Sequence, residues 1–311
     1  MNTSSVDRLT TISVVDVTGA DAAAIVHNVT TNAVKTLPLG AGCETFITEV
    51  RGRILGHGYL YRLPDRLRLI GAAGQSERIA AHVDRYTIRE DATASVRDDE
   101  FATWVFSAAM ADALGIHAPV GSGPMVWQQS LAGQDVSFYR TAWLGPATCV
   151  ALVSPEQDRL LAAYFRDHGI AVAGQEAFEN KRVLAGFPWY GTDLDESNLP
   201  QEADRDSLAV SFNKGCYLGQ ETVARLDALG QVQKKLVRWS ITGCVPVAGS
   251  KLIANDKVVG RLTSVAEVEG DAVAMGMARR THFEPGSVAT GTDDASGKAF
   301  TGTVLDHGEH E

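Results

Sequence analysis

Glycine spacing in the last quarter of the chain is the sequence feature that most narrows the possible folds. From Lys234 onward, short apolar runs alternate with glycines. The runs are residues 236–241, 251–253, 258–259 and 272–277, and the glycines are Gly243, Gly249, Gly260, Gly270 and Gly286. Short β-prone runs between turn residues predict a small all-β barrel or sandwich. We therefore expect a β-barrel domain at residues 233–305 and a flexible tail at 306–311.

The preceding residues follow a different order, in which strand-like segments come before helix-like ones. The segments typical of strands are residues 12–17, 46–50, 54–63 and 66–70. They are followed by a helical pattern at residues 76–85, and another helical pattern lies at 22–29. This order predicts an α+β fold and argues against a doubly wound parallel sheet.

The middle of the chain repeats this pattern less clearly, with strand-like runs at residues 104–106 and 149–153. A helix is predicted at 155–167 and a second one at 175–185, each ended by a glycine. The side chains that we expect on the buried face of the first helix are Leu160, Leu161, Tyr164 and Phe165.

Composition argues against several classes of partner. The chain has 311 residues, of which 45% are apolar, and no apolar run approaches the ~20 residues of a membrane-spanning helix. Its first residues lack the basic patch and apolar block of a signal peptide, so we expect a cytoplasmic protein. The formal net charge of -10 disfavours stable nucleic-acid binding, which needs a basic surface.

The cysteines and histidines do not form a recognisable metal motif. The four cysteines, Cys43, Cys149, Cys216 and Cys244, include no C-x-x-C pair, and their low number fits a reducing compartment. Asp193, Asp195 and Glu196 are candidate metal ligands, although a solvated polar loop is the favoured interpretation. We therefore expect no metal site.

Residues 212–226 combine the features that make a cysteine reactive. Lys214 precedes Gly215 and Cys216, and a predicted helix begins near Gly219. A helix N-terminus and a nearby ammonium group both lower the pKa of a thiol. The alternative is that Cys216 is a small buried hydrophobe in a turn. Local chemistry alone does not separate the two interpretations.

This segment resembles a known family signature. Residues 214–221 read K-G-C-Y-L-G-Q-E, which is similar to the K-G-C-Y-x-G-Q-E signature of the YgfZ branch of the folate-binding GcvT-like proteins. Other segments resemble the same family, and they are residues 29–32, 182–186, 189–196, 199–202, 259–264 and 274–276. The resemblance covers nearly the whole chain.

The resemblance implies a ring of α+β subdomains around a central folate-binding channel, with two interleaved subdomains in residues 1–232. It implies tetrahydrofolate as a cofactor and iron–sulphur client proteins as partners. The implied role is maturation or repair of iron–sulphur proteins, with an effect on tRNA modification in bacteria. The implied catalytic residues are Cys216 and Lys214. The implied cofactor-binding residues are Trp189, Tyr190, Glu202, Tyr217, Gln220 and Arg225.

Two positions depart from the aminomethyltransferases of this superfamily. His57 or Gly56 stands where those enzymes have an Asp that positions the reacting amine, and a neutral imidazole supplies no fixed negative charge. Leu184 stands where a Glu resembles a pterin anchor, and an unpaired buried polar edge costs ~1–3 kcal/mol. Both departures predict weakened folate binding, and the first argues against aminomethyl transfer. Glu202 is a possible substitute acid.

Three functions follow from this pattern. The leading hypothesis is a YgfZ-like folate-binding protein with a reactive Cys216. The alternatives are a folate-dependent aminomethyl or methyl transferase, which is the expected class if the chain is an enzyme, and a non-catalytic scaffold that no longer binds folate.

Overall fold

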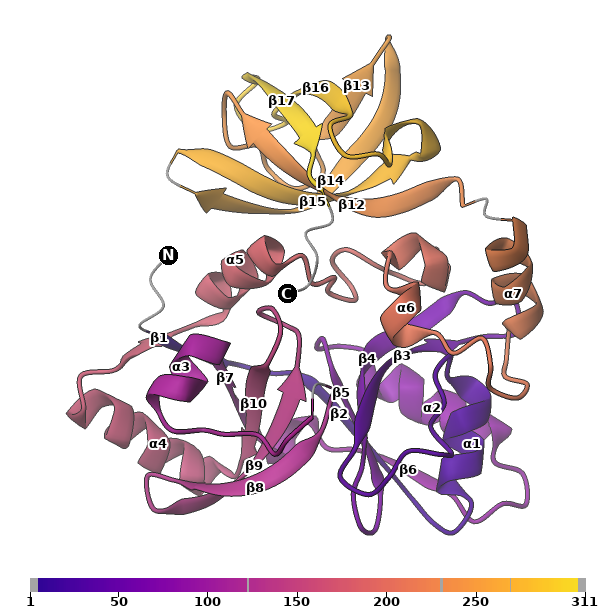
Figure 1. The fold of residues 1–311 in the computed structure, drawn as a ribbon, viewed down its shortest axis with the longest axis vertical. Coiled ribbons are helices and arrows are strands. Elements are labelled where there is room, and N and C mark those ends of the chain that lie inside the picture. Colours follow the sequence, from indigo (N-terminus) through magenta and orange to yellow (C-terminus); the bar gives the residue numbers. More distant parts are fainter. Residues whose placement is uncertain (1–4, 122, 230–231, 269, 307–311) are drawn as a thin grey trace.

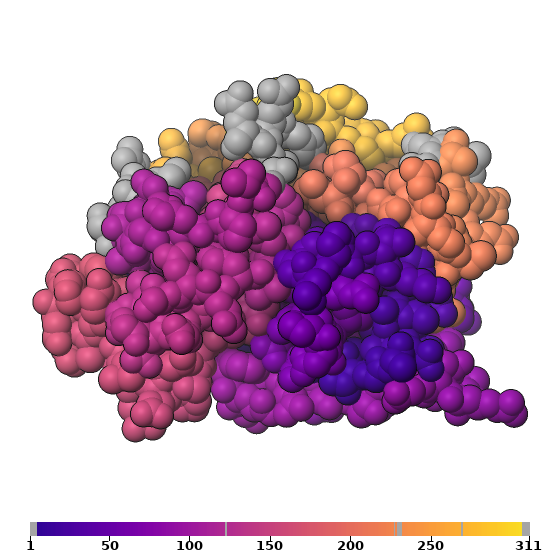
Figure 2. All heavy atoms as spheres, turned by 60° about the horizontal axis from the view of Figure 1, so that its bottom comes forward, coloured from indigo at the N-terminus to yellow at the C-terminus, as the bar shows by residue number. Residues whose placement is uncertain are grey.

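The computed structural model describes residues 5–121, 123–229, 232–268 and 270–306. It contains two open sheets that lie side by side beneath a closed barrel, with helices around and between them (Figure 1). Seen from below, the violet and pink lobes that carry the two sheets are in direct contact (Figure 2). The architecture is α+β, as the order of strand-like and helix-like segments predicted.

The first sheet has the strand order β3-β4-β5-β2-β6. Its strands are β2 (Ser13–Thr18), β3 (Gly42–Thr48), β4 (Ile54–Arg62), β5 (Leu67–Gly71) and β6 (Thr93–Val96). Helices α1 (Ala22–Val29) and α2 (Ser76–Tyr86) pack on one face of it. Val15, Ile25 and Ile79 belong to the apolar core between sheet and helices, so the alternating strand side chains and the helical stripes meet there.

The second sheet has the order β11-β1-β7-β10-β9-β8. Its strands are β1 (Ser5–Leu9), β7 (Ala102–Phe106), β8 (Val126–Leu131), β9 (Gln134–Thr141), β10 (Thr148–Val153) and β11 (Ala171–Ala173). Its helical elements are η1 (Asp98–Glu100), α3 (Ala108–Ala113), α4 (Pro155–Asp167) and α5 (Gln175–Ala185). The N-terminal strand β1 therefore joins a sheet whose other strands come after residue 101.

Helices α4 and α5 have the predicted bounds because their ends carry strong local signals. Ser154 and Gln157 form a capping box at the start of α4, and Gly186 ends α5 in the left-handed conformation with φ +73°. The prediction for Leu160 was wrong, since this side chain is 45% exposed. The buried stripe of α4 runs through Leu161 and Phe165, and a residue adjacent in sequence to Leu161 points about 100° away from it.

The C-terminal barrel is closed in the order β12-β15-β14-β13-β16-β17. Its elements are β12 (Lys234–Thr242), β13 (Lys251–Ala254), β14 (Lys257–Val268), β15 (Asp271–Arg279), η3 (Arg280–His282), β16 (Val288–Thr292) and β17 (Ala299–Val304). This confirms the predicted all-β barrel. Of the predicted tail, residues 307–311 lie outside the described residues.

A buried ion pair between Arg182 and Asp193 is bonded to the barrel through Ser264. Arg182 of α5 donates from Nη1 to Asp193 Oδ2 at 2.6 Å and from Nη2 to Ser264 Oγ of β14 at 2.8 Å. The Ser264 hydroxyl donates in turn to Asp193 Oδ1 at 2.6 Å. Asp193, a candidate metal ligand from the sequence, is thus paired with a guanidinium.

Three short elements run between the barrel and the sheets (Figure 1), and they are η2 (Pro200–Ala203), α6 (Asp206–Ala209) and α7 (Gln220–Leu229). No helix within the described ranges is long and apolar enough to cross a membrane.

Candidate functional site

A cavity of about 410 Å³ lies where the two sheets meet. One wall comes from β3 and β4 of the first sheet, and the opposite wall comes from β9 and the loop that follows it. The residues lining it are Gly42, Cys43, Glu44, Tyr59, Gly123, Pro124, Arg140, Thr141, Ala142, Gly145, Pro146, Ala147, Ala185, Arg205 and Leu208. Its size and its apolar wall with a few polar groups are typical of small-molecule sites.

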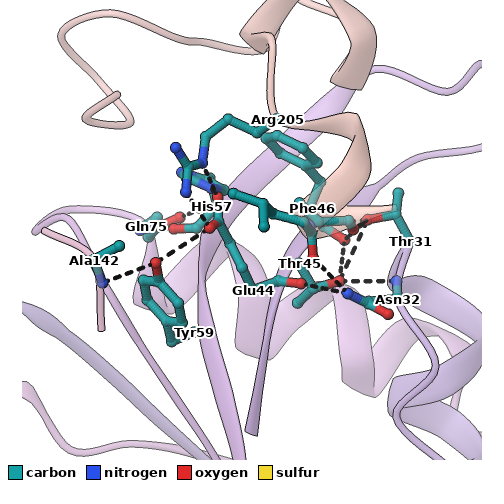
Figure 3. Close-up of polar contacts among 12 residues, drawn as sticks. Thr31, Asn32, Glu44, Thr45, Phe46, His57, Tyr59, Gln75, Ala142 and Arg205 are labelled. Atoms are coloured by element: carbon teal, nitrogen blue, oxygen red, sulfur yellow. Dashed lines mark hydrogen bonds and ion pairs between the residues drawn. The ribbon is translucent and has the colours of Figure 1, made fainter. Parts of the chain in front are cut away.

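Glu44 is the centre of the polar network in this cavity (Figure 3). Arg205 donates from Nε and Nη2 to its two carboxylate oxygens, with 2.6 Å between Nη2 and Oε2. His57 Nε2 lies 2.8 Å from Oε1, and the Tyr59 hydroxyl donates to Oε2 at 3.1 Å. Burial raises the pKa of Glu44, but Arg205 and His57 outweigh it and bring the pKa to about 2. The carboxylate is therefore ionised and fully paired.

His57 is held rigidly behind this carboxylate. Its ring is stacked on Phe46 and Phe187, with centroid distances of 4.6 and 5.5 Å. The Gln75 side chain accepts from the His57 backbone N–H at 2.8 Å and donates to its carbonyl at 3.0 Å. The sequence has the neutral His57 where the aminomethyltransferases have an Asp. In the structure, a buried carboxylate does lie beside this position, and it comes from Glu44 of the neighbouring strand β3.

The predicted catalytic segment forms a separate surface feature. Cys216 is exposed, and it is not among the described residues that line the cavity. Lys214 is buried, and its ammonium donates to the carbonyls of His27, Thr30 and Asn32 at 2.6, 2.6 and 2.9 Å. Burial lowers the pKa of Lys214 to about 7. The ammonium is therefore directed at carbonyls of the end of α1 and of the loop after it, and these bonds anchor the Cys216 segment.

The start of α7 is fixed on α1 and on the turn between β3 and β4. The Leu218 backbone N–H donates to the Asn28 carbonyl at 2.8 Å, and the Leu218 carbonyl accepts from the Thr48 hydroxyl at 2.8 Å. Gly219 has φ +78°, and a Cβ there would lie 2.4 Å from Cα of Gly52. A side chain at position 219 would force the two segments apart. Cys216 therefore projects from a firmly anchored loop.

Three of the predicted folate-binding residues, Trp189, Tyr190 and Tyr217, are core aromatics. Trp189 and Tyr190 are 7% and 6% exposed and belong to the main apolar core. The Tyr190 hydroxyl accepts from Arg78 Nη1 at 2.6 Å.

Another predicted ligand, Glu202, is already bonded within the chain. Its Oε2 accepts from Asn198 Nδ2 at 2.8 Å and from the Leu199 N–H at 3.2 Å. Oε2 also lies 3.4 Å from Lys234 Nζ. These bonds fix the carboxylate in the segment that precedes α6.

The remaining predicted ligands lie at or near α7. Tyr217 is 8% exposed, and its ring centroid is 4.8 Å from Lys214 Nζ. Gln220 is the first residue of α7, and Arg225 is exposed on the same helix. Neither these residues nor Trp189 and Glu202 are among the described residues lining the cavity.

The residues that do line the cavity, above all Glu44, Tyr59, Arg140 and Arg205, were not predicted from the sequence. The predicted strand began at residue 46, whereas β3 begins at Gly42, so Glu44 was placed outside it. A signal was available, because Glu44 lies two positions before Phe46 and would share its face of an extended strand. Cys43 also lines the cavity.

Within the described part of the chain, no group of three or more His, Cys, Asp or Glu side chains is placed to hold a metal ion.

Comparison with solved structures gives a close match in fold. The glycine cleavage system aminomethyltransferase T from Bartonella henselae superposes with a TM-score of 0.83 and 19% identity, over 98% of this chain and 86% of that one. This chain has the aminomethyltransferase fold. No protein-family model matches it.

Sequence relatives include proteins with different printed names. An aminomethyltransferase of Streptomyces avermitilis is 24% identical over 90% of this chain and 79% of its own length. A chloroplastic Arabidopsis thaliana protein named as a transferase is 23% identical, and the alignment spans 90% of this chain and 66% of that protein. A mitochondrial protein of Pyricularia oryzae, named an iron-sulfur cluster assembly factor IBA57 homolog, is 29% identical over 72% of this chain and 54% of its own length.

Proposed function

We propose that this aminomethyltransferase-like chain is a folate-binding protein that supports the maturation or repair of iron–sulphur proteins, with Cys216 as the group presented to the client. The observation that carries the proposal is the position of Cys216, which is exposed on a loop anchored by Lys214. A thiol outside the cavity is accessible to a macromolecule. The relative named as an iron–sulphur cluster assembly factor supports the same interpretation.

The cavity fits a reduced folate in part of its chemistry. Its volume of about 410 Å³ and its glycine, alanine and proline walls suit a flat bicyclic ring. Glu44 occupies Nε and Nη2 of Arg205, which leaves Nη1 for an oxygen acceptor on the ligand. Leu184 supplies no carboxylate for a pterin amino edge. A bound tetrahydrofolate would supply a one-carbon carrier, and Arg205 and Tyr59 would orient it.

The same geometry disfavours aminomethyl transfer. Glu44 is the only carboxylate among the described residues lining the cavity, and it is paired with Arg205, His57 and Tyr59. A carboxylate bound in this way does not serve as a free counter-charge for a cationic amine intermediate. We therefore assign the functional role to the exposed thiol of Cys216, which a client protein can reach.

Replacing Cys216 tests this proposal. We expect Cys216→Ala to fail to restore iron–sulphur enzyme activity in a cell that lacks its YgfZ-like protein, while the purified variant unfolds at the wild-type urea concentration. Cys244→Ser is the matched control, because Cys244 is half-buried in the distant barrel, and it should restore activity fully. Full restoration by Cys216→Ala would remove Cys216 from the mechanism.

The second candidate is a folate-dependent aminomethyltransferase, favoured by the fold match and by the named relatives. An assay of one-carbon transfer to tetrahydrofolate separates the two, because robust turnover would reverse the ranking. Calorimetry with folinic acid tests the third possibility, a scaffold without ligand, which predicts no binding heat at high ligand concentration.

A further inference from the structure

We propose that the cavity accepts ligands with an anionic tail, and that Arg140 at its open end binds that tail. The inference rests on the proposed use of the cavity as a folate site and deepens it by fixing the direction in which a ligand lies. It also assigns a specificity-determining residue that the sequence motifs did not indicate.

The charge balance of the cavity is the first observation. Among the described residues lining it, Glu44 carries a negative charge, and Arg140 and Arg205 carry positive charges. Glu44 and Arg205 neutralise each other through their paired hydrogen bonds. The cavity therefore keeps the charge of Arg140, although the whole chain has a net charge of -10. A concave apolar wall concentrates the field of such a charge on a bound ligand.

The Arg140 side chain has hydrogen-bond donors to spare. Its Nη1 donates to the Gly121 carbonyl, while its Nε is buried without a partner among the described residues. No carboxylate in the described ranges forms an ion pair with it. The terminal nitrogens Nη1 and Nη2 together suit a carboxylate, which accepts two parallel hydrogen bonds.

The backbone of Arg140 is fixed, so its position relative to the cavity is defined. The Arg140 N–H donates to the Met125 carbonyl at 2.8 Å, and the Arg140 carbonyl accepts from the Tyr61 hydroxyl at 2.7 Å. Both contacts lie within the region where the two sheets meet. The side chain is therefore presented from a rigid strand end, which favours specific recognition.

Burial distinguishes the two ends of the cavity. At the inner end, Arg205 is 5% exposed and lies over the Phe187 ring with its Cζ 4.9 Å from the centroid. At the other end, Arg140 is half-buried, beside the exposed Gly123 and near the 46% exposed Leu208. A charged tail is costly to bury without a partner. A ligand with a neutral ring and a carboxylate tail therefore places its ring toward Arg205 and its tail toward Arg140.

Arg225, which the family resemblance implied as a cofactor-binding residue, is the rival cation for a ligand carboxylate. It is exposed on α7 and is not among the described residues that line the cavity. Arg225→Gln thus provides a direct comparison with Arg140→Gln. Arg89→Gln is a neutral control, because Arg89 is exposed in the segment between α2 and β6.

Calorimetry on the full chain with two ligands tests the inference. One ligand is folinic acid, and the other is its dimethyl ester, in which both tail carboxylates are neutral. We expect the wild type to bind the acid about tenfold more tightly than the ester, as one charge-assisted contact allows. Arg140→Gln should bind both ligands equally, Arg140→Lys should keep part of the preference, and Arg225→Gln and Arg89→Gln should keep all of it.

Three other outcomes of the calorimetry would contradict the inference, and each in a different way. Equal binding of acid and ester by the wild type would overturn the inference while leaving folate binding intact. Loss of the preference in Arg225→Gln, with the preference unchanged in Arg140→Gln, would assign the tail to α7 instead. If the wild type binds neither ligand, the proposed folate function fails, and the inference fails with it.

Discussion

Arg205 and Lys214 are both buried cations that tie late parts of the chain to early ones, yet their charges are compensated in different ways. Arg205 forms an ion pair with the Glu44 carboxylate. Burial lowers the pKa of the Arg205 guanidinium, but Glu44 raises it by more, so the group stays charged. Lys214 meets three carbonyls and forms no ion pair with a carboxylate in the described ranges, and burial lowers its pKa to about 7. The Glu44–Arg205 pair in the cavity therefore stays charged at neutral pH, whereas Lys214, which anchors the Cys216 loop, loses its proton near pH 7.

Removing the charge on Glu44 should give the largest effect. Glu44→Gln leaves the Arg205 guanidinium buried without its counter-charge, and we expect a loss of about 3–5 kcal/mol in the free energy of unfolding. Urea titration at pH 7 measures it. Glu267→Gln, on the exposed side of β14, is the control and should change stability by less than about 0.5 kcal/mol.

The same pair has a pH signature. The folded pKa of Glu44 is about 2 and its ordinary value is 4.5, so the unfolded chain binds the proton more readily. The stabilisation is therefore complete above about pH 4.5 and is lost as the pH falls toward 2. Equal acid sensitivity of the wild type and Glu44→Gln would contradict the ion-pair account.

Lys214→Met should give an intermediate effect. It removes three hydrogen bonds and leaves the carbonyls of His27, Thr30 and Asn32 without this donor, so we expect a loss of about 1–3 kcal/mol. Urea titration of both proteins at several pH values provides the measurement.

The difference in the free energy of unfolding between the wild type and Lys214→Met should depend on pH, and this dependence tests whether Lys214, unlike Arg205, loses its charge. Between about pH 7 and 10.5, the unfolded chain holds the Lys214 proton and the folded chain does not. The wild type should therefore gain stability relative to Lys214→Met as the pH rises through this range. A constant difference would mean that the three carbonyls hold the ammonium charged, as Glu44 holds Arg205.

Cys216→Ser should have the smallest effect on stability, within about 0.5 kcal/mol, because the side chain is exposed. It should nevertheless abolish the fastest reaction of the native protein with a thiol reagent. Burial raises the pKa of Cys43 to about 12 and that of Cys149 to about 11, which keeps both thiols protonated and slow. A fast thiol that persists in Cys216→Ser would show that another cysteine is the reactive one.

Local signals explain what the sequence predicted correctly. The bounds of α1, α4 and α5 match the structure, since caps, glycine stops and apolar stripes lie within the helices or next to their ends. The barrel was predicted from its glycine-punctuated runs. These features depend on residues that are close together in the chain.

The cavity could not be predicted in the same way. Glu44 and Arg205 are 161 positions apart, and no local pattern links them. The direction of Lys214 was also unpredictable, because this residue neighbours Cys216 in sequence but bonds to carbonyls more than 180 positions earlier. Contacts of this kind follow from the packing of whole sheets.

These long separations also set the order in which the molecule matures during synthesis. The strand that carries Glu44 and the loop after α1 leave the ribosome early, whereas Arg205 and Lys214 follow more than 160 residues later. Until then, the Glu44 carboxylate lacks Arg205, and the carbonyls of His27, Thr30 and Asn32 lack the Lys214 ammonium. Leaving such groups without these partners is costly once they are buried. We therefore expect the nascent first sheet to stay open to water on this side until residues 205–214 have been made.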